Sequence, residues 1–244
     1  VKELPFVYFI EPIEFPSKKD DAEGRSLHRS NVINADYASG RHYDGTNVTV
    51  GLADDGTIGP HIDFTGRVTQ HLTTNDGNHG DMTSGICVGA GNLIDRIRGM
   101  GTGAYLHVFD INGYPQIVNA VSNFNNYGVV ITSTSYSQGC NVYNAATQSG
   151  DQLIHNNSQL TFVFSAGNDG TVSCNYGAGN LWGNITGGYK MGKNVIAVGN
   201  LENTDVLVTS SSRGPASDGR NKPDICTNGG SQRSTDQDNT FQDG

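Results

Sequence analysis

The sequence predicts an α/β protein with a doubly wound, mainly parallel central sheet flanked by helices. Five short runs are almost continuously apolar, which is typical of strands buried on both faces of a parallel sheet. They cover residues 47–53, 106–111, 128–135, 161–166 and 194–200. Three segments of helical character lie between the first four runs, at residues 79–91, 115–128 and 144–157. This alternation of strand and helix is the pattern of a doubly wound sheet.

Residues 1–24 are predicted to form an N-terminal extension with a linker, and residues 25–244 the main domain. The apolar run at residues 6–13 precedes a polar, charged stretch at residues 16–26 that contains Gly and is typical of a linker. The alternative interpretation of the apolar run is an ordinary edge strand of the main domain.

Composition limits the possible partners. The chain has 24 acidic and 15 basic residues, a net charge of −9, and its basic residues form no stripe. This balance argues against nucleic acid or an anionic membrane as a partner. No run of about 18 apolar residues occurs, so no membrane span is expected. The 33 glycines, together with frequent Asn and sparse Lys, favour a secreted or extracytoplasmic protein.

The four cysteines are Cys87, Cys140, Cys174 and Cys226. They include no C-x-x-C pair and have no His at ligand spacing, which argues against a zinc site. The residues alone leave open one disulfide, two disulfides or none.

Chemically useful side chains follow the apolar runs, at the strand ends where ligands bind in such sheets. Asp54 ends the first run, His79 opens the next helical segment, and Asn168 follows the run at 161–166. Taken singly, each has a structural explanation as a turn former, a helix cap or an ordinary histidine. Together they offer an acid that orients an imidazole, a general base, and an amide donor for an oxyanion. A nucleotide site is disfavoured, because Asp54 and Asp55 occupy the place of a phosphate.

Several segments resemble subtilisin-like (subtilase, S8-type) serine proteases, in the order in which that family has them. They are VTVGLADDGTIGPHIDF (48–64), NHGDMTSGICVGAG (78–91), VVITSTSYSQG (129–139), FVFSAGNDG (162–170) and NVIAVGNLENTDVLVTSSSRGPASDGRNKPDI (194–225). The last is the most specific match, since it contains the Ser-Ser-Arg-Gly-Pro and Lys-Pro-Asp runs of the family.

The resemblance implies a serine endopeptidase with an Asp-His-Ser triad. Asp54 would orient His79, His79 would act as the general base, and Asn168 would donate to the oxyanion. A peptide substrate would lie antiparallel to two segments of the chain. The residues implied in substrate binding are Ser133, Ser135, Tyr136, Ser137, Ser165, Ala166 and Gly167. The chemistry requires no cofactor or catalytic metal; structural calcium is common in the family, but no oxygen-rich loop can be assigned to it.

Three departures from the family pattern affect the site. Asp81 and Met82 replace a Thr and a second His of the usual motif. Asp81 is interpreted as a helix cap or as a carboxylate that raises the basicity of His79. Asp55 gives Asp-Asp-Gly in place of Asp-Thr-Gly, which indicates either a preference for basic substrates or a turn-stabilising side chain.

Three further expectations concern the cysteines and the N-terminal segment. Cys140 and Cys174 each follow a substrate-binding segment, so a disulfide between them at the rim of the cleft is one hypothesis and free thiols the other. Cys87 is expected to be a small buried residue. Residues 1–24 resemble the end of a subtilase propeptide.

The nucleophile is expected beyond the sequence. Residues 236–244, DQDNTFQDG, look like a loop and resemble the approach to the family's Gly-Thr-Ser-Met-Ala motif, with Gly244 as its glycine. The favoured hypothesis is that the serine lies on a separately cleaved C-terminal companion chain that stays bound; a continuation of the same chain and a truncation are the alternatives. A different class of function is a catalytically inactive subtilase-like module that binds peptides or partners.

Overall fold

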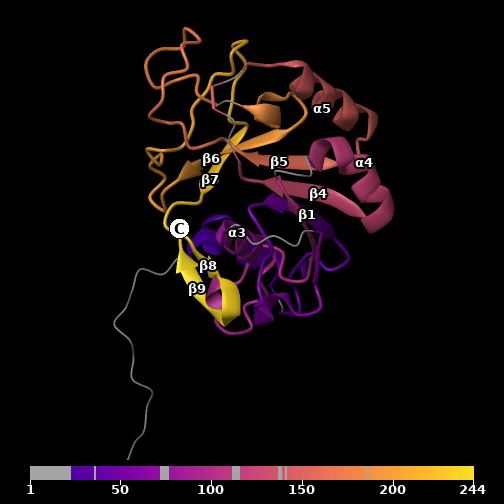
Figure 1. The fold of residues 1–244 in the computed structure, drawn as a ribbon. Coiled ribbons are helices and arrows are strands. Elements are labelled where there is room, and N and C mark those ends of the chain that lie inside the picture. Colours follow the sequence, from indigo (N-terminus) through magenta and orange to yellow (C-terminus); the bar gives the residue numbers. More distant parts are fainter. Residues whose placement is uncertain are drawn as a thin grey trace, which may run out of the picture.

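The computed structural model describes residues 23–35, 37–71, 77–111, 116–136, 139–140, 142–185 and 187–244. Its centre is a seven-stranded sheet with the strand order β2-β3-β1-β4-β5-β6-β7, in which every neighbouring pair is parallel (Figure 1). The strands are β1 (Thr49–Asp54), β2 (Val68–Gln70), β3 (Tyr105–Asp110), β4 (Val129–Thr134), β5 (Thr161–Ser165), β6 (Ile196–Leu201) and β7 (Ile225–Asn228). The predicted fold class is confirmed.

Helices cover the two faces of the sheet. The longer ones are α3 (His79–Val88), α4 (Gln116–Tyr127) and α5 (Ala145–Asn156), and the short ones are α1 (Glu23–Leu27) and α2 (Ser30–Ile33). In Figure 1, α4 and α5 lie together on one side of the sheet, whereas α3 lies on the other. Two buried clusters match this division, one joining Val88 of α3 to β1 and β3, the other joining α4 and α5 to β5. Among the described residues, every helix is too short or too polar to cross a bilayer.

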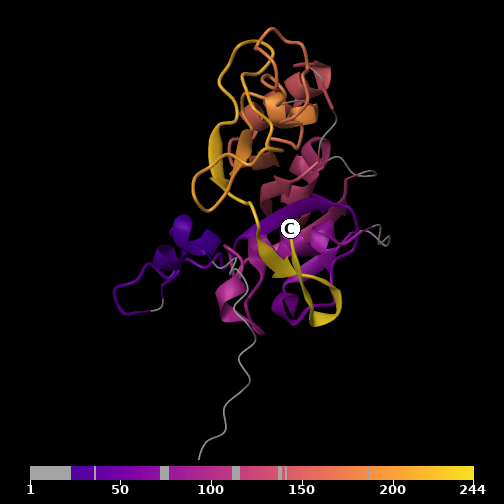
Figure 2. The same ribbon diagram turned by 90° about the vertical axis from the view of Figure 1, so that its left-hand side faces the viewer.

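The C-terminal residues form a hairpin instead of the expected loop. Strands β8 (Arg233–Thr235) and β9 (Phe241–Asp243) pair antiparallel, joined through the 3₁₀ turn η4 (Gln237–Asn239), and lie along α3 (Figure 2). The hydroxyls of Ser234 and Thr235 donate to the carbonyls of Met82 and Asp81, at 2.8 and 2.7 Å. Gly85 makes this approach possible, because a Cβ there would lie 2.2 Å from both hydroxyl oxygens. Three-residue strands rich in polar side chains show no apolar pattern, so the sequence did not reveal them.

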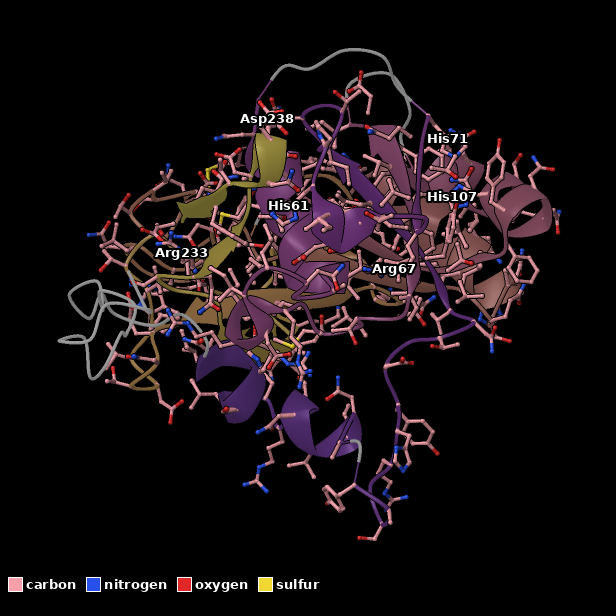
Figure 3. All side chains as sticks on the ribbon, turned by 90° about the horizontal axis from the view of Figure 1, so that it is seen from below. His61, Arg67, His71, His107, Arg233 and Asp238 are labelled. Atoms are coloured by element: carbon pink, nitrogen blue, oxygen red, sulfur yellow. A yellow bond between two sulfur atoms is a disulfide. The ribbon has the colours of Figure 1, made fainter. Side chains whose placement is uncertain are left out.

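Three other 3₁₀ turns complete the described elements: η1 (Ile62–Phe64), η2 (Asp95–Ile97) and η3 (Gly188–Met191). The turn of the hairpin rests on η1, since the side-chain oxygen of Asn239 accepts from the backbone N–H of Ile62 at 2.7 Å. His61 also packs edge-on against Phe241, with ring centroids 5.1 Å apart, and Asp238 lies close by in Figure 3. The predicted extension at residues 1–24 falls almost wholly outside the described residues and stays a prediction.

A stack of aromatic rings closes one edge of the sheet, where β2 meets β3. His71 Nε2 and His107 Nδ1 are 2.7 Å apart, and Figure 3 shows the two side chains beside each other. The His71 ring also stacks on Phe109 with a 4.5 Å centroid separation, and His107 stacks on Tyr127 at 4.8 Å. Burial lowers the pKa of both histidines, and the charge of His71 lowers the pKa of His107 further.

This histidine pair predicts that the fold is sensitive to acid. Because the folded pKa of each ring is below its unfolded value, the unfolded chain binds more protons, and stability is lost as the pH falls through and below about 6.5. The free energy of unfolding, measured by urea titration, is expected to be lower at pH 5.5 than at pH 7.5. A His71→Phe/His107→Phe double variant keeps the ring stack and should lose less stability over the same interval. An unchanged pH dependence in that variant would contradict the assignment.

Candidate active site

The sheet brings three of the predicted site residues to one edge. β1, β4 and β5 are parallel neighbours, so their carboxyl ends meet on the same side. Asp54 is the last residue of β1, Ser135 directly follows β4, and Asn168 follows β5. His79 is the first residue of α3, which packs against β1. The topology therefore gathers side chains that are far apart in the sequence.

Asp54 and His79 form a close pair. Asp54 Oδ1 lies 2.6 Å from His79 Nδ1, and the Asp54 side chain is 3% exposed, whereas that of His79 is 51% exposed. Asp54 also accepts from the Thr83 hydroxyl at 2.9 Å and from the backbone N–H of Asp55 at 2.9 Å. The acid is thus fixed in place by the protein, and the imidazole that it orients reaches the surface.

The pair raises the pKa of His79. The hydrogen bond that His79 donates to Asp54 is the main cause. Burial lowers the pKa, and the charges of Asp54 and Asp55 raise it. A carboxylate that accepts from Nδ1–H fixes the tautomer with a free lone pair on Nε2. His79 is therefore arranged as a base.

Asp55 caps the helix that carries His79. Its carboxylate oxygens accept from the backbone N–H groups of His79, at 3.3 Å, and of Gly80, at 2.8 Å, which are donors without a partner inside the helix. Gly77 leaves room for this carboxylate, since a Cβ there would lie 2.1 Å from Asp55 Oδ2. The Asp55 carboxylate thus bonds to α3 and not to the turn that contains Asp55, which corrects the turn-stabilising interpretation. The predicted role of Asp55 in substrate preference stays a prediction.

Both interpretations of Asp81 were wrong. Its side chain is fully buried, and its Oδ1 accepts from the backbone N–H of Gly59 at 2.5 Å while its Oδ2 accepts from Gln237 Nε2 at 3.4 Å. The acids that raise the pKa of His79 are Asp54 and Asp55. Burial raises the pKa of Asp81. Asp81 therefore fastens α3 to the loop after β1 and to the hairpin, and the capping role belongs to Asp55.

The loop that presents Asn168 is held by the Ser-Ser-Arg-Gly-Pro segment. The Ser212 backbone N–H donates to the carbonyl of Gly167 at 2.8 Å, and the Ser212 hydroxyl accepts from the N–H of Asp169 at 3.0 Å. Gly167 has φ +111°, a conformation that favours glycine. Asn168 lies between these two anchors and is exposed. The most specific part of the sequence motif therefore positions the predicted oxyanion donor.

The predicted substrate-binding residues line the ends of β4 and β5. Ser135 is exposed, Ser133 and Ser165 are half-buried, and Ala166 and Gly167 are buried. Ala166 donates its N–H to Val198 at 2.7 Å, so its main chain continues the sheet. Ser137 lies outside the described residues. Peptide binding by these residues stays a prediction.

A buried lysine that sequence reasoning missed holds the segment that follows β4. Lys190 is 1% exposed, and its Nζ donates to the carbonyl of Tyr136 at 2.7 Å. Burial lowers the pKa of Lys190 to about 8, opposed by the charge of Asp169. The Tyr136 ring packs edge-on against Phe164. Nothing in the sequence around Lys190 signals a partner 54 positions away.

The disulfide hypothesis is confirmed by a bond between Cys140 and Cys174, with a sequence separation of 34. It ties the segment after Tyr136 to the loop after Asn168. Cys87 packs against the first core cluster, where burial raises its pKa to about 11, and Cys226 is a free, exposed thiol.

Removing this disulfide is expected to destabilise the protein. Removing a cross-link that closes a loop of this length lowers the free energy of unfolding by about 3 to 4 kcal/mol, chiefly because the unfolded chain gains entropy. We expect that loss for Cys140→Ser/Cys174→Ser in urea unfolding, whereas Cys226→Ser should change stability by less than about 0.5 kcal/mol. Equal effects of the two changes would refute the assignment.

The last residues of the hairpin lie beside the helix that carries His79. Gln242 Nε2 donates to the carbonyl of Asn78 at 2.7 Å, one residue before His79. Gly244 exchanges backbone hydrogen bonds with Gln232, and a Cβ on it would lie 2.4 Å from Met82 Sδ. Gly244 is thus placed against the first turns of α3.

The three side chains Asp54, Asp55 and His79 also each offer one metal-ligand atom, within 4.8 Å of one another. The two carboxylates already accept hydrogen bonds. That of Asp54 accepts from His79 and Thr83, and that of Asp55 accepts from the first N–H groups of α3. This arrangement favours an acid and base pair over a metal centre.

The parallel α/β fold, with the Asp54 and His79 pair at the end of β1, defines a protein of the subtilisin-like α/β class. The model of the subtilase family matches residues 45–243, and the chain belongs to that family.

Solved structures agree in fold. The prenylagaramide maturation protease PagA is 18% identical over 82% of this chain and 70% of its own, with a TM-score of 0.65. The epidermin leader peptide processing serine protease EpiP from Staphylococcus aureus is 15% identical over 81% and 61%, with a TM-score of 0.61. The psychrophilic subtilisin-like protease Apa1 from the Antarctic psychrotroph Pseudoalteromonas sp. AS-11 is 16% identical over 85% and 46%, with a TM-score of 0.58.

Proposed function

We propose that the protein is a serine endopeptidase, in which Asp54 and His79 activate a serine and Asn168 donates to the oxyanion. The observation that carries this proposal is the 2.6 Å contact between the buried Asp54 carboxylate and the half-exposed His79 ring. Membership of the subtilase family supports the same reaction. The substrate is a peptide or protein segment, and the chemistry requires no cofactor.

The proposed steps assign one task to each of these side chains. His79 Nε2 takes the proton of the serine hydroxyl, while Asp54 holds Nδ1–H and stabilises the imidazolium. The serine oxygen attacks the scissile carbonyl carbon, and the Asn168 amide with a backbone N–H binds the developing oxyanion. His79 then passes its proton to the leaving amine, and water hydrolyses the acyl-enzyme with His79 again as the base. An extended substrate lies along Ser133–Tyr136 on one side and Ser165–Gly167 on the other.

The serine is proposed to come from a segment that enters the site at Gly244. The position of Gly244 against Met82, together with the contact of Gln242 with Asn78, supports this, because a segment starting there begins beside His79. That segment is either covalently continuous with Gly244 or the predicted companion chain that stays bound after cleavage. The composition of the active protein under denaturing conditions distinguishes the two: two separate chains, one of them ending at Gly244, indicate cleavage, and a single chain that continues past Gly244 indicates continuity.

Removing the oxyanion donor is expected to slow the reaction without unfolding the protein. Asn168→Ala should lower kcat by about 10²- to 10³-fold and leave KM within a few-fold, since the amide acts on charge that develops in the transition state. Steady-state kinetics on a chromogenic peptide measures this. Asn156, an exposed residue at the end of α5, provides the control Asn156→Ala. A comparable loss in both variants would count against the role of Asn168.

A second candidate is a catalytically inactive module that binds peptides. The observation behind it is that the half-exposed His79 and the exposed Ser135 and Asn168 lie at the ends of neighbouring elements, where they would contact a bound peptide whether or not a nucleophile is present. Incubating the complete natural protein with unfolded casein decides between the two. An endopeptidase releases new amino termini, and a serine-directed inhibitor stops the release. Binding of casein without cleavage identifies the module.

A secreted or extracytoplasmic location is part of the proposal. The Cys140–Cys174 disulfide supports it, because such bonds persist in oxidising compartments. Fractionation of the source cells, with recovery of the bulk of the protein outside the cytosol, tests it.

A further inference from the structure

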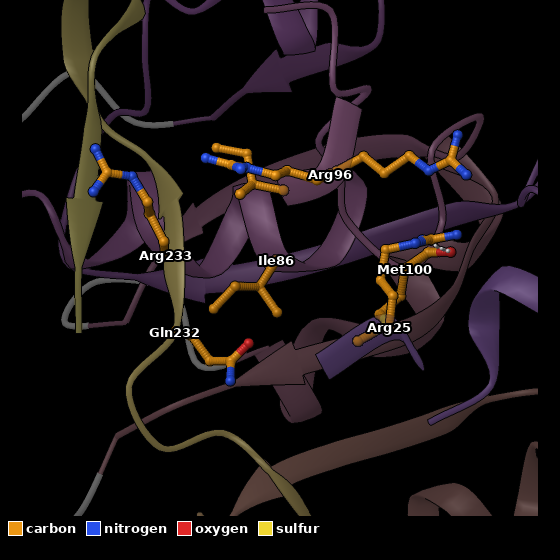
Figure 4. A pocket seen from close by; sticks show the side chains of 8 residues that line it. Arg25, Ile86, Arg96, Met100, Gln232 and Arg233 are labelled. Atoms are coloured by element: carbon orange, nitrogen blue, oxygen red, sulfur yellow. Dashed lines mark hydrogen bonds between the residues drawn. The ribbon is translucent and has the colours of Figure 1, made fainter. Parts of the chain in front are cut away.

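Basic side chains converge on one small pocket of this acidic chain. Of the 15 lysines and arginines, four line it: Arg25, Arg96, Arg98 and Arg233. Ile86, about two helical turns beyond His79 on α3, lies at its base, with Arg25 and Arg233 on opposite sides in Figure 4. Such a concentration of positive charge in a chain of net charge −9 indicates a ligand of opposite charge.

Arg25 is the deepest of these groups and lacks a partner for one of its nitrogens. The residue is 6% exposed, and its Nη1 donates to the carbonyls of Gly99 and Met100. Its Nη2 is buried without a hydrogen-bond partner among the described residues. Burial lowers the pKa of Arg25, and the charge of Arg98 lowers it further, while Asp95 opposes both. An unpaired guanidinium nitrogen in such surroundings is costly. Because this nitrogen is closed off from solvent, an anion in the pocket would bond it after the Arg25 side chain turns toward the pocket.

Arg98 and Arg233 each have more N–H donors than their ion pairs use. Arg98 Nη1 pairs with Asp95, and Arg233 Nη1 pairs with Asp243, each at 3.1 Å. Both acids are largely exposed, and both arginine side chains are 31% exposed, so these are surface ion pairs of small energy. A guanidinium has five N–H donors, so each arginine can keep its aspartate and still bind a second group.

We propose that this pocket binds a small oxyanion, a phosphate or a carboxylate. The pocket is small and partly open: its space of about 290 Å³ includes solvent outside the protein, so a bound anion would keep part of its surface in water. The planar fork of arginine matches the oxygens of both anions. The ligand is either a free ion or the exposed group of a larger molecule.

The bound anion would join parts of the chain that are distant in sequence. The four arginines belong to α1, to η2 and the segment that follows it, and to β8. β8 also packs on α3 through Ser234 and Thr235. Because the anion binds only the folded arrangement, it raises stability by mass action and fastens α1 to the body of the protein. This role is independent of the proposed peptidase reaction.

The test is calorimetric titration of the full chain with inorganic phosphate and, separately, with succinate, at constant ionic strength. We expect saturable binding with one site and a matching rise in Tm. Arg233→Gln should weaken binding by about 10-fold, the loss of one charge-assisted contact. Arg220→Gln is the matched control, because Arg220 has a similar exposure of 29% and a similar ion pair with Asp218, but lies outside the pocket.

Each outcome decides the proposal. Preferential binding of phosphate identifies a phosphate site, and preferential binding of succinate identifies a carboxylate site. Absence of saturable binding to both anions overturns the proposal. Equal weakening by Arg233→Gln and Arg220→Gln also overturns it, since that pattern shows general charge screening. The partly exposed Arg233 is chosen over the buried Arg25, so that the variant folds; circular dichroism confirms this.

Discussion

Replacing His79 by alanine in the complete natural protein is expected to lower kcat for a peptide substrate by about 10⁵- to 10⁶-fold. The loss is large because the imidazole serves as base in acylation and as acid in expulsion of the amine, so both halves of the cycle fail. KM should change little, since the ring contributes to the transition state more than to the bound substrate. Initial rates with a chromogenic peptide measure the effect.

His155 provides the control for this variant. It lies in the last turn of α5 and is exposed, so His155→Ala removes a comparable ring away from the Asp54 pair. We expect its kcat to remain within about two-fold of the unmodified protein. A His79→Ala protein that is folded and retains a tenth or more of the activity would refute the assignment of the base.

The second large effect is expected for Asp54→Asn, a change that preserves size. Asparagine offers Nδ1 of His79 a less suitable partner and favours the wrong tautomer, so kcat should fall by about 10⁴-fold. Because the Asp54 carboxylate raises the pKa of His79, its loss should also move the acidic limb of the kcat/KM profile to lower pH. A pH profile from 5 to 9 measures both effects.

Asp55→Asn separates orientation of the base from capping of its helix. Asp55 bonds the N–H groups of His79 and Gly80, so its removal should cost about 1 kcal/mol of stability and only a small part of kcat. If Asp55→Asn lowered kcat as far as Asp54→Asn, the roles given to the two acids would be wrong.

Much of the site was predictable because its residues follow buried strands. The apolar runs before Asp54, Ser135 and Asn168 correspond to β1, β4 and β5, and parallel pairing brings their ends together. The motif around His79 located the base. Local apolar pattern and topology therefore predicted that Asp54 and Asn168 lie at the same end of the sheet, whereas His79 was identified from the motif; their catalytic roles belong to the proposed function.

The remainder depends on contacts between distant residues, which leave no local pattern. The bond from Lys190 to the Tyr136 carbonyl spans 54 positions, and the capping of Gly80 by Asp55 spans 25. Asp81 was misinterpreted because its position near the start of α3 suggested a cap, whereas its partners are Gly59 and Gln237.

The short strands β2, β7, β8 and β9 were missed for a related reason. Each is three or four residues long, and the buried side chains of β8, Ser234 and Thr235, are polar. Such segments are too short to show a periodic pattern of apolar residues, and the elements around them determine how they pair.

Covalent labelling of the complete natural protein with a fluorophosphonate probe, followed by mapping of the modified residue by mass spectrometry, tests the proposed triad most directly. We predict a single labelled serine, located in the segment that enters at Gly244 and outside residues 1–244, with labelling lost in His79→Ala. A labelled serine within residues 1–244, or labelling that His79→Ala leaves unchanged, would contradict the proposed site. Absence of labelling in a folded sample would instead identify a binding module.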